Sequence, residues 1–176
     1  MAYDPQPGRL AERVRRELRR NDGAPDRVRS VVTETVPSPI PGELLVSVAR
    51  ATPGDAAGGD PLDAAVAVEF AALHQYLHAI PSASAPLVTP VAGSPYATDG
   101  IAAIIDGDWL QAAAFSRLSR SVEAAGRSRR CYDALAGGST RCYELLERES
   151  PAEAPLAPLI AAAGRIGAIV GGLDRD

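Results

Sequence analysis

The sequence contains no lysine: its eighteen basic residues are all arginine, and its net charge is −4. Binding to nucleic-acid phosphates needs a basic surface, so this mildly acidic composition argues against a nucleic-acid partner for the domain as a whole. Phosphate-binding glycine loops use a lysine between a strand and a helix, and neither Gly137-Gly138 nor Gly171-Gly172 has that context. We therefore expect no nucleic acid and no nucleotide-binding loop.

Cysteine is scarce as well. Cys131 and Cys142 are eleven residues apart, without a CxxC pair or a nearby histidine, so a zinc-cysteine site is not expected. Two free thiols suit a reducing cytoplasm. The N-terminus lacks the apolar core of a signal peptide, and no run of eighteen apolar residues occurs. We expect a cytoplasmic protein with no transmembrane segment.

Aromatic residues make up only 5% of the chain, and small aliphatic residues dominate a hydrophobic content of 46%. Such side chains suit closely packed helices, and no segment shows the alternation of a β-strand. At 176 residues we predict a single all-α helical bundle over residues 1–176, with residues 1–8 flexible. Apolar spacing and Pro and Gly signals predict helices at 9–20, 26–36, 43–51, 62–80, 101–118, 141–149 and 159–170. The helix at 101–118 is expected to continue through 117–135 and to break at Gly137-Gly138.

The first predicted helix, residues 9–20, is basic and amphipathic. Leu10, Val14 and Leu18 form one apolar stripe, and six arginines surround it. The functional interpretation is binding to an anionic membrane surface or a nucleic acid. The narrow stripe favours the structural one, a helix that covers one side of the bundle with solvated arginines.

Two central helices, 62–80 and 101–118, are expected to face each other across a loop rich in Pro, Ser and Ala. Pro61 suits the first turn of the former helix, and Pro81 is expected to end it. Apolar residues recur at steps of three and four in both. They are Leu62, Val66, Phe70, Leu73 and Leu77 in the first helix, and Ile101, Ile104, Ile105, Trp109, Ala112 and Phe115 in the second. We expect these two sets to form the buried sides.

His74 and His78 are four residues apart, so both imidazoles lie on one helix face, a spacing that metal ions can use. A third ligand is needed. The nearest expected carboxylates, Asp106 and Asp108, are two residues apart and point in different directions. We therefore predict hydrogen-bonded, partly buried histidines, and we assign no metal and no other cofactor.

Glu69 lies in an otherwise apolar helix, where a buried carboxylate needs a partner. An ion pair with an arginine is the structural interpretation, and a general base with a raised pKa is the functional one. Asp108 is expected to bond a neighbouring helix or loop, with Gly107 allowing close approach. The candidate pocket residues, none assigned a catalytic role, are Glu69, His74, His78, Asp106 and Asp108.

Three segments share a pattern with one known family. They read AVEF at residues 67–70 with His78 further along, AIIDGDWLQAAAF at 103–115, and GAIVGGL at 167–173. Here the chain resembles the trans-type isoprenyl diphosphate synthases, or polyprenyl synthetases, whose helices read Ala-Val-Glu-Leu before two His, A-I-L-x-G-D-x-L-x-x-x-A-F, and G-x-x-G-G-Q, with Leu173 in place of the Gln. The likeness spans residues 41–176 and implies the N-terminal part of the isoprenoid synthase fold.

The resemblance breaks where the family binds metal. After the second His, family members carry an aspartate-rich motif, DDxxD, whose carboxylates hold Mg²⁺ and the substrate diphosphate. Residues 79–83 here read AIPSA, the Gly-Lys-Arg expected near 39–42 is absent, and no arginine occurs between Arg50 and Arg117. The sequence also ends at Asp176, before the family's second aspartate-rich motif. The resemblance thus implies a truncated scaffold without its diphosphate-binding groups.

Three functions fit this pattern. The first is a degenerate, non-catalytic synthase-like protein acting as a partner or regulatory subunit. The family dimerises through helices near the Gly-Asp helix and includes pairs of active and inactive subunits, which implies a homo-oligomer or a hetero-oligomer with an active prenyl synthase. The second is a helical module binding an isoprenoid or other lipid in an apolar cavity. The third, an active prenyltransferase with unconventional metal ligands, ranks last because each lost stabilising group costs about 3 kcal/mol.

Overall fold

The computed structural model describes residues 8–35, 40–54, 60–82, 96, 99–122, 124–147 and 156–173. Within these ranges all regular structure is helical and no strand occurs, so the all-α class is confirmed. The flexible start expected at residues 1–8 lies, except for Gly8, outside the described residues. The helices are α1 (Arg9–Arg20), α2 (Asp26–Thr35), α3 (Ile40–Ala51), α4 (Pro61–Ser82), α5 (Gly100–Ser121), α6 (Ala125–Glu147) and α7 (Ala157–Val170).

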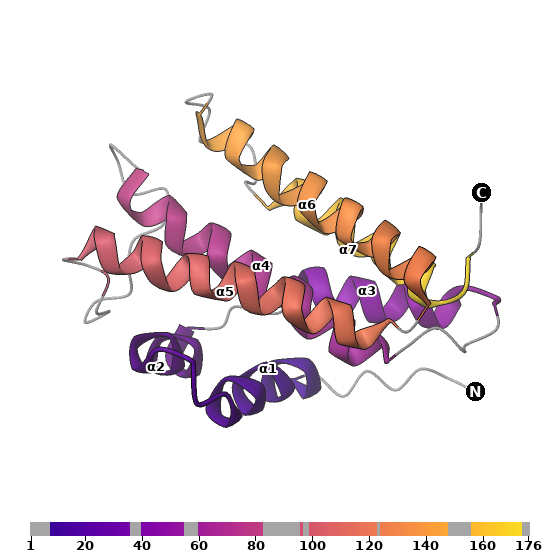
Figure 1. Cartoon of the computed structure of the whole chain (residues 1–176), viewed down its shortest axis with the longest axis horizontal. Helices are drawn as coiled ribbons and strands as arrows, with labels where there is room; N and C mark the ends of the chain where they lie inside the picture. Colours follow the sequence, from indigo (N-terminus) through magenta and orange to yellow (C-terminus); the bar gives the residue numbers. More distant parts are fainter. Residues whose placement is uncertain are drawn as a thin grey trace.

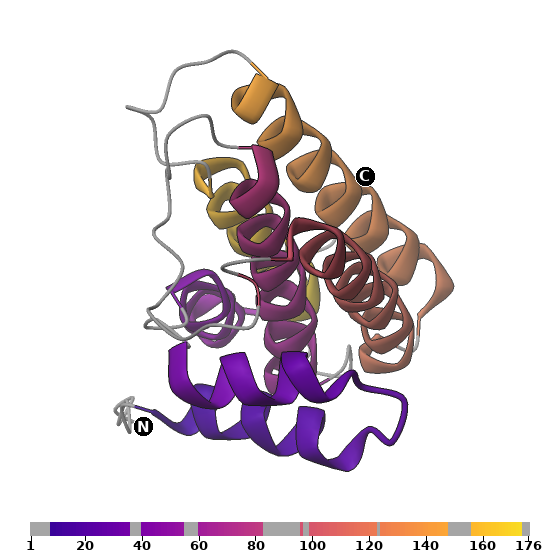
Figure 2. The ribbon, with the colours of Figure 1, turned by 90° about the vertical axis from the view of Figure 1, so that its left-hand side faces the viewer.

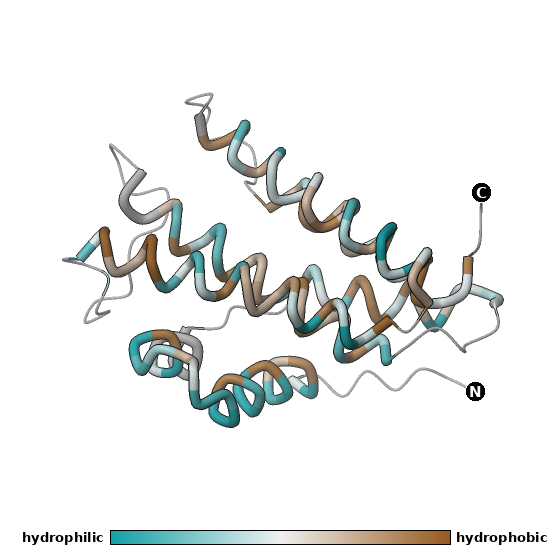
Figure 3. Tube along the Cα trace, viewed as in Figure 1, coloured by the Kyte–Doolittle hydropathy of each residue, from teal (hydrophilic) through white to brown (hydrophobic). Residues whose placement is uncertain are grey.

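The pair α1 and α2 covers one side of the bundle (Figure 1). Leu10, Val14 and Leu18 of α1 are at most 4% exposed, and Figure 3 shows the hydrophobic side of this helix turned toward α4 and α5. Asn21 shapes the following turn, because its side-chain oxygen accepts a hydrogen bond from the Gly23 N–H at 3.1 Å. The apolar stripe is therefore buried within the protein.

Helix α4 runs through the middle of the bundle and contacts α1, α3, α5, α6 and α7 (Figure 2). Residues 64–72 are buried on every side, so the prediction of a single apolar stripe was wrong. Alanines around the helix allow neighbours to approach from several directions. Asp60 caps the start of α4 by accepting the Leu62 N–H at 2.9 Å, and Pro61 is the first helical residue, as expected. The helix includes Pro81 and ends one residue later, at Ser82.

Helix α5 lies antiparallel beside α4 (Figure 1), and its buried side is the opposite of the predicted one. The predicted core residues Ile101, Ile104 and Ile105 are 72%, 40% and 58% exposed. Ala112 is also exposed, and the other two of the predicted set are half-buried. Small residues face α4 instead because they let the two backbones come closer. The buried residues of α5 are Ala102, Ala103, Asp106, Gly107, Leu110, Ala114, Leu118 and Ser121.

Helix α6 is continuous across Gly137-Gly138, so the predicted break was wrong. The chain breaks earlier, at Val122, which is extended. Gly138 stays inside the helix because α7 crosses it closely: a Cβ there would lie 2.9 Å from the Ala162 Cβ and 3.2 Å from the Pro158 carbonyl oxygen. Helix α7 begins at Ala157, two residues earlier than predicted, and has Pro158 in its first turn.

Helix α3 begins three residues earlier than predicted and includes Pro41 in its first turn. Proline is tolerated there because the first turn has no helical acceptor for its missing N–H. Helix α3 packs on α4 and α7. Gly167 of α7 lies so close that a Cβ would come within 2.5 Å of the Leu45 carbonyl oxygen. No helix of the described part of the chain is both long and apolar enough to cross a membrane.

Candidate functional site

Three of the five candidate residues converge where α4, α5 and α6 meet. His74, His78 and Asp108 each offer one possible metal-ligand atom, and these three atoms lie within 4.8 Å of one another. His78 Nε2 and Asp108 Oδ1 lie 3.1 Å apart. The expectation that too few ligands converge for a metal ion was therefore wrong, because the antiparallel packing of α4 and α5 brings Asp108 to the histidines.

Tyr143 of α6 holds this cluster from the other side. Its hydroxyl lies 2.5 Å from His74 Nε2 and 3.3 Å from His78 Nδ1. The histidine rings lie 4.2 Å apart between centroids, and the tyrosine ring meets each edge-on. The second nitrogen of His78, Nε2, also lies 3.2 Å from the Ile104 carbonyl oxygen. One hydroxyl thus orients both imidazoles.

The two histidines differ in their surroundings. His74 is 2% exposed, and burial, followed by the charge of His78, lowers the pKa of His74 to about 4. Its Nδ1 atom has no partner at hydrogen-bonding geometry among the described residues, and a weak backbone contact with Gly107 only partly opposes this lowering of the pKa. His78 and Asp108 lie nearer the solvent, and the Asp108 side chain is 67% exposed. The cluster therefore contains a neutral inner imidazole and an open outer edge.

Gly107 makes room for this arrangement, as expected from the Gly-Asp pair. A Cβ at this position would lie 2.5 Å from His78 Cδ2 and 2.9 Å from His78 Nε2. Any other residue would displace the imidazole, because such contacts are shorter than van der Waals packing allows. Asp108 contacts a side chain of the neighbouring helix rather than a backbone group.

Asp106 lies apart from this cluster and is 1% exposed. Its Oδ2 accepts hydrogen bonds from Arg27 Nε at 2.9 Å and from the Tyr96 hydroxyl at 2.8 Å. Burial and the bond to Asp106 raise the pKa of Tyr96. Asp106 thus anchors α2 to α5, a structural role that satisfies a buried carboxylate.

Glu69 also lies apart, 5% exposed between α3 and α4. Its Oε1 accepts the Gly42 N–H at 2.6 Å. This N–H belongs to the first turn of α3, whose donors have no helical partner, so Glu69 caps α3 from a neighbouring helix. The expected ion pair with an arginine is absent among the described residues. Burial raises the pKa of Glu69 to about 7 despite the Gly42 bond.

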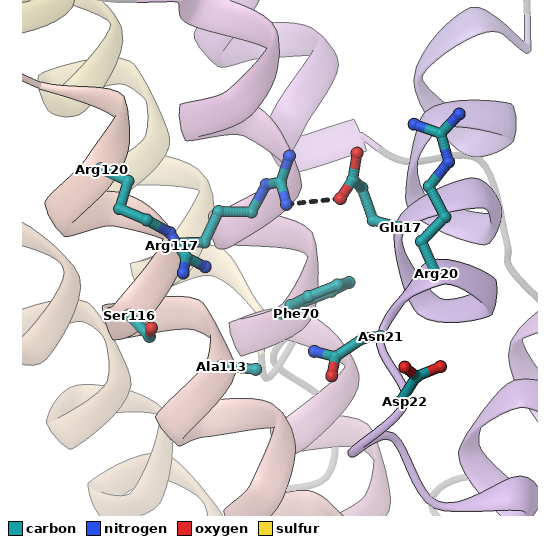
Figure 4. A pocket seen from close by; sticks show the side chains of 9 residues that line it. All are labelled: Glu17, Arg20, Asn21, Asp22, Phe70, Ala113, Ser116, Arg117 and Arg120. Carbon is teal, nitrogen blue, oxygen red and sulfur yellow. Dashed lines mark hydrogen bonds and ion pairs between the residues drawn. The ribbon is translucent and has the colours of Figure 1, made fainter.

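A cleft of about 320 Å³ lies between α1 and α5, near the C-terminal half of α5 (Figure 4). Its walls are largely polar, with Phe70 and Ala113 as the apolar contributors. Arg117 in this cleft bonds Glu17 and Asp63, each at 2.8 Å. The cleft does not provide the apolar cavity expected of an isoprenoid site, and its inner arginine already holds two carboxylates.

Sequence reasoning missed several residues that complete these sites. Tyr143 is 65 positions from His78, and Arg27 is 79 from Asp106, so no local spacing links them. The one available signal was the need for partners: a buried histidine pair and a buried aspartate each require a donor or acceptor from elsewhere.

Comparisons with protein-family models, with curated proteins and with solved structures found no match for this chain.

Proposed function

We propose that this chain acts by association, as a non-catalytic, isoprenyl-synthase-like helical subunit whose α5 packs against α5 of a second copy. The observation that carries the proposal is the exposure of Ile101, Ile104 and Ile105, at 72%, 40% and 58%. Their spacing places them on one helix face. Contiguous exposed apolar residues mark interaction sites, whereas single ones do not.

The same face continues toward the C-terminal end of α5 with smaller residues. Ala112, Ser116 and Ser119 are exposed and Phe115 is half-buried. Helix α5 has 22 residues and is therefore about 33 Å long. Its face is bulky at one end and small at the other, so two antiparallel copies would set each bulky half on the partner's small half. This shape complementarity suits a two-fold dimer.

The ends of α5 carry opposite charges that fit the same arrangement. Asp99 precedes the bulky half and Arg120 lies near the end of the small half, and both are exposed. Antiparallel pairing would bring each aspartate toward the other copy's arginine. Such pairs contribute to orientation more than to affinity.

The resemblance in sequence supports the choice of helix and the lack of catalysis. Helix α5 contains the Gly-Asp pattern near which the isoprenyl synthases dimerise. Ala79, in the place of the first aspartate of their metal-binding motif, is 3% exposed and has no oxygen to offer a metal ion. We propose that the scaffold has kept its contact helix without the diphosphate site.

The test is the oligomeric state of Ile105→Glu against a matched control. Ala161 lies exposed on α7, so Ala161→Glu adds the same charge elsewhere. Sedimentation equilibrium should show a dimer for the wild type and for Ala161→Glu, and a helical monomer by circular dichroism for Ile105→Glu. A monomeric wild type, or a dimer that survives Ile105→Glu, would overturn the proposal. So would a wild-type monomer that instead binds an active prenyl synthase.

The orientation can be tested by cysteine cross-linking. Ile104→Cys chains mixed with Ser116→Cys chains should form mixed cross-links in preference to links between two Ile104→Cys chains. The native thiols at Cys131 and Cys142 are 0% exposed, so they leave a low background. Preferential linking of two Ile104→Cys chains would contradict the antiparallel arrangement.

A further inference from the structure

We propose that His74, His78 and Asp108 bind one divalent transition-metal ion of the zinc type, with Tyr143 positioning both imidazoles. The ligand geometry exists within one copy of the chain and does not require the proposed dimer, although Asp108 lies on the exposed face of α5 that the dimer would cover. The three ligand atoms lie within 4.8 Å of one another, and His78 Nε2 is 3.1 Å from Asp108 Oδ1. Ligands of tetrahedral zinc are about 3.3 Å apart. Closing the site around an ion thus needs shifts of about 1.5 Å or less.

The unpartnered nitrogen of His74 points to a ligand. His74 is 2% exposed, and its Nδ1 has no hydrogen-bond partner among the described residues. A buried polar atom without a partner costs stability, and most such atoms in folded proteins are satisfied. A metal ion accepts the lone pair of this nitrogen.

The position of Tyr143 supports the same assignment. Its hydroxyl contacts His74 Nε2 and His78 Nδ1, one nitrogen on each ring. This leaves His74 Nδ1 and His78 Nε2, the two nitrogens on the side of Gly107. A ligating histidine usually donates its other N–H to an outer acceptor. The tyrosine oxygen has two lone pairs and can accept both N–H groups.

Without a metal ion the inner imidazole is poorly satisfied. If His78 Nε2 donates to Asp108 Oδ1 or to the Ile104 carbonyl oxygen, His78 Nδ1 accepts from Tyr143, and the tyrosine oxygen then accepts from His74 Nε2. His74 Nδ1 is then a buried acceptor that no donor meets at hydrogen-bonding geometry. In the other tautomer of His74 this nitrogen has only a weak contact with the Gly107 backbone.

The donor set selects the kind of ion. Two imidazoles and one carboxylate suit Zn²⁺, Co²⁺ or Ni²⁺, whereas Mg²⁺ prefers oxygen ligands. Three protein ligands leave a fourth tetrahedral position open. The Asp108 side chain is 67% exposed in the single chain, so that position opens toward the exposed face of α5. This chemistry differs from that of an aspartate-bound Mg²⁺ cluster.

The test uses the whole 176-residue chain without a purification tag, freed of metal by chelation. Isothermal titration with Zn²⁺ should show one site per chain, Co²⁺ should give the visible absorption of a tetrahedral complex, and Mg²⁺ should not compete. Asp108→Asn should abolish tight binding. Asp133→Asn, which changes an exposed carboxylate on α6, should bind like the wild type.

The role of Tyr143 is tested separately. Tyr143→Phe should keep one site per chain but weaken zinc affinity about 10- to 100-fold, the usual effect of losing an outer partner. A purely structural tyrosine would lower the melting temperature of the metal-free chain without changing zinc affinity. His78→Gln should remove the Co²⁺ spectrum.

Three results would overturn the metal site. The first is that the chain binds none of Zn²⁺, Co²⁺ and Ni²⁺. The second is an unchanged zinc affinity in Asp108→Asn, and the third is a loss of zinc binding when Cys131 and Cys142 are replaced by serine. The exposed Asp108 can be replaced without disturbing the core, so this variant tests the site even if His78→Gln does not fold.

Discussion

Replacing Glu69 with glutamine should make stability less dependent on pH. Glu69 is 5% exposed, accepts the Gly42 N–H at 2.6 Å, and has its pKa raised by burial to about 7. Glutamine has nearly the same shape and keeps an oxygen for the Gly42 N–H. Glutamine is uncharged at every pH, so the comparison isolates the free-energy cost of ionising the buried Glu69 carboxyl group.

The magnitude follows from the two pKa values. In the unfolded chain the carboxyl takes its ordinary pKa of 4.5, and in the folded chain it takes a value of about 7. Between these values the folded chain binds more protons, so stability falls as pH rises through this window. The contribution of Glu69 is fully present below about pH 4.5, and about 3 kcal/mol of it is lost above pH 7.

The assay is urea unfolding followed by circular dichroism at several values between about pH 5 and pH 8. Across this range the wild type should lose about 2 to 3 kcal/mol relative to Glu69→Gln. Glu144→Gln is the matched control, because Glu144 is exposed on α6. That variant should stay within about 0.5 kcal/mol of the wild type at each pH.

Two results would refute this reasoning. Parallel pH profiles for the wild type and Glu69→Gln would mean that Glu69 is not held protonated by burial. A wild type that gains stability relative to the variant with rising pH would mean that the bond from Gly42 outweighs the burial. Taking differences between variants cancels the titration of all other groups that do not contact Glu69.

Three further predictions concern packing, charge and acid stability. In urea unfolding, Gly138→Ala should destabilise the protein by about 1–3 kcal/mol, because α7 occupies the space that the new Cβ needs. The neighbouring change Gly137→Ala is the control: its Cβ meets open space, so it should stabilise the helix by about 0.5–1 kcal/mol. Arg117→Gln should cost about 1.5–3 kcal/mol, since its half-buried carboxylate partners lose a charged donor, while the exposed Arg120→Gln should change stability by less than about 0.5 kcal/mol. Burial lowers the pKa of His74 to about 4, so the wild type should lose stability as pH falls from about 6.5 to about 4. Glutamine does not titrate, so over the same range the free energy of unfolding of His74→Gln should fall less than that of the wild type, by a difference of up to about 3 kcal/mol.

The positions of several helices were predictable because their signals are local. In α1 the spacing of Leu10, Val14 and Leu18 gave the buried stripe, and Pro61 marked the start of α4. Caps, first-turn prolines and apolar periodicity act within a few residues of the chain. The absence of aspartates at residues 79–83 is likewise a property of the sequence alone.

The buried face of α5 could not be predicted in this way. Ile101, Ile104 and Ile105 have the periodicity of a core-facing stripe, yet the small residues beside them pack on α4. Periodicity shows that a helix has two different faces, but it does not show which face meets another helix. Likewise, Gly138 was predicted to end a helix, whereas close contact with α7 explains the glycine within it.

The sequence by itself determined the helical class, the positions of most helices and the pairing of His74 with His78 on one face. Only the tertiary structure decided that Asp108 and Tyr143 join these histidines, and that the isoleucines of α5 lie outside. The physical reason is distance along the chain. Helix formation depends on residues three or four apart, whereas a site depends on which helices pack together and on the side chains small enough to let them.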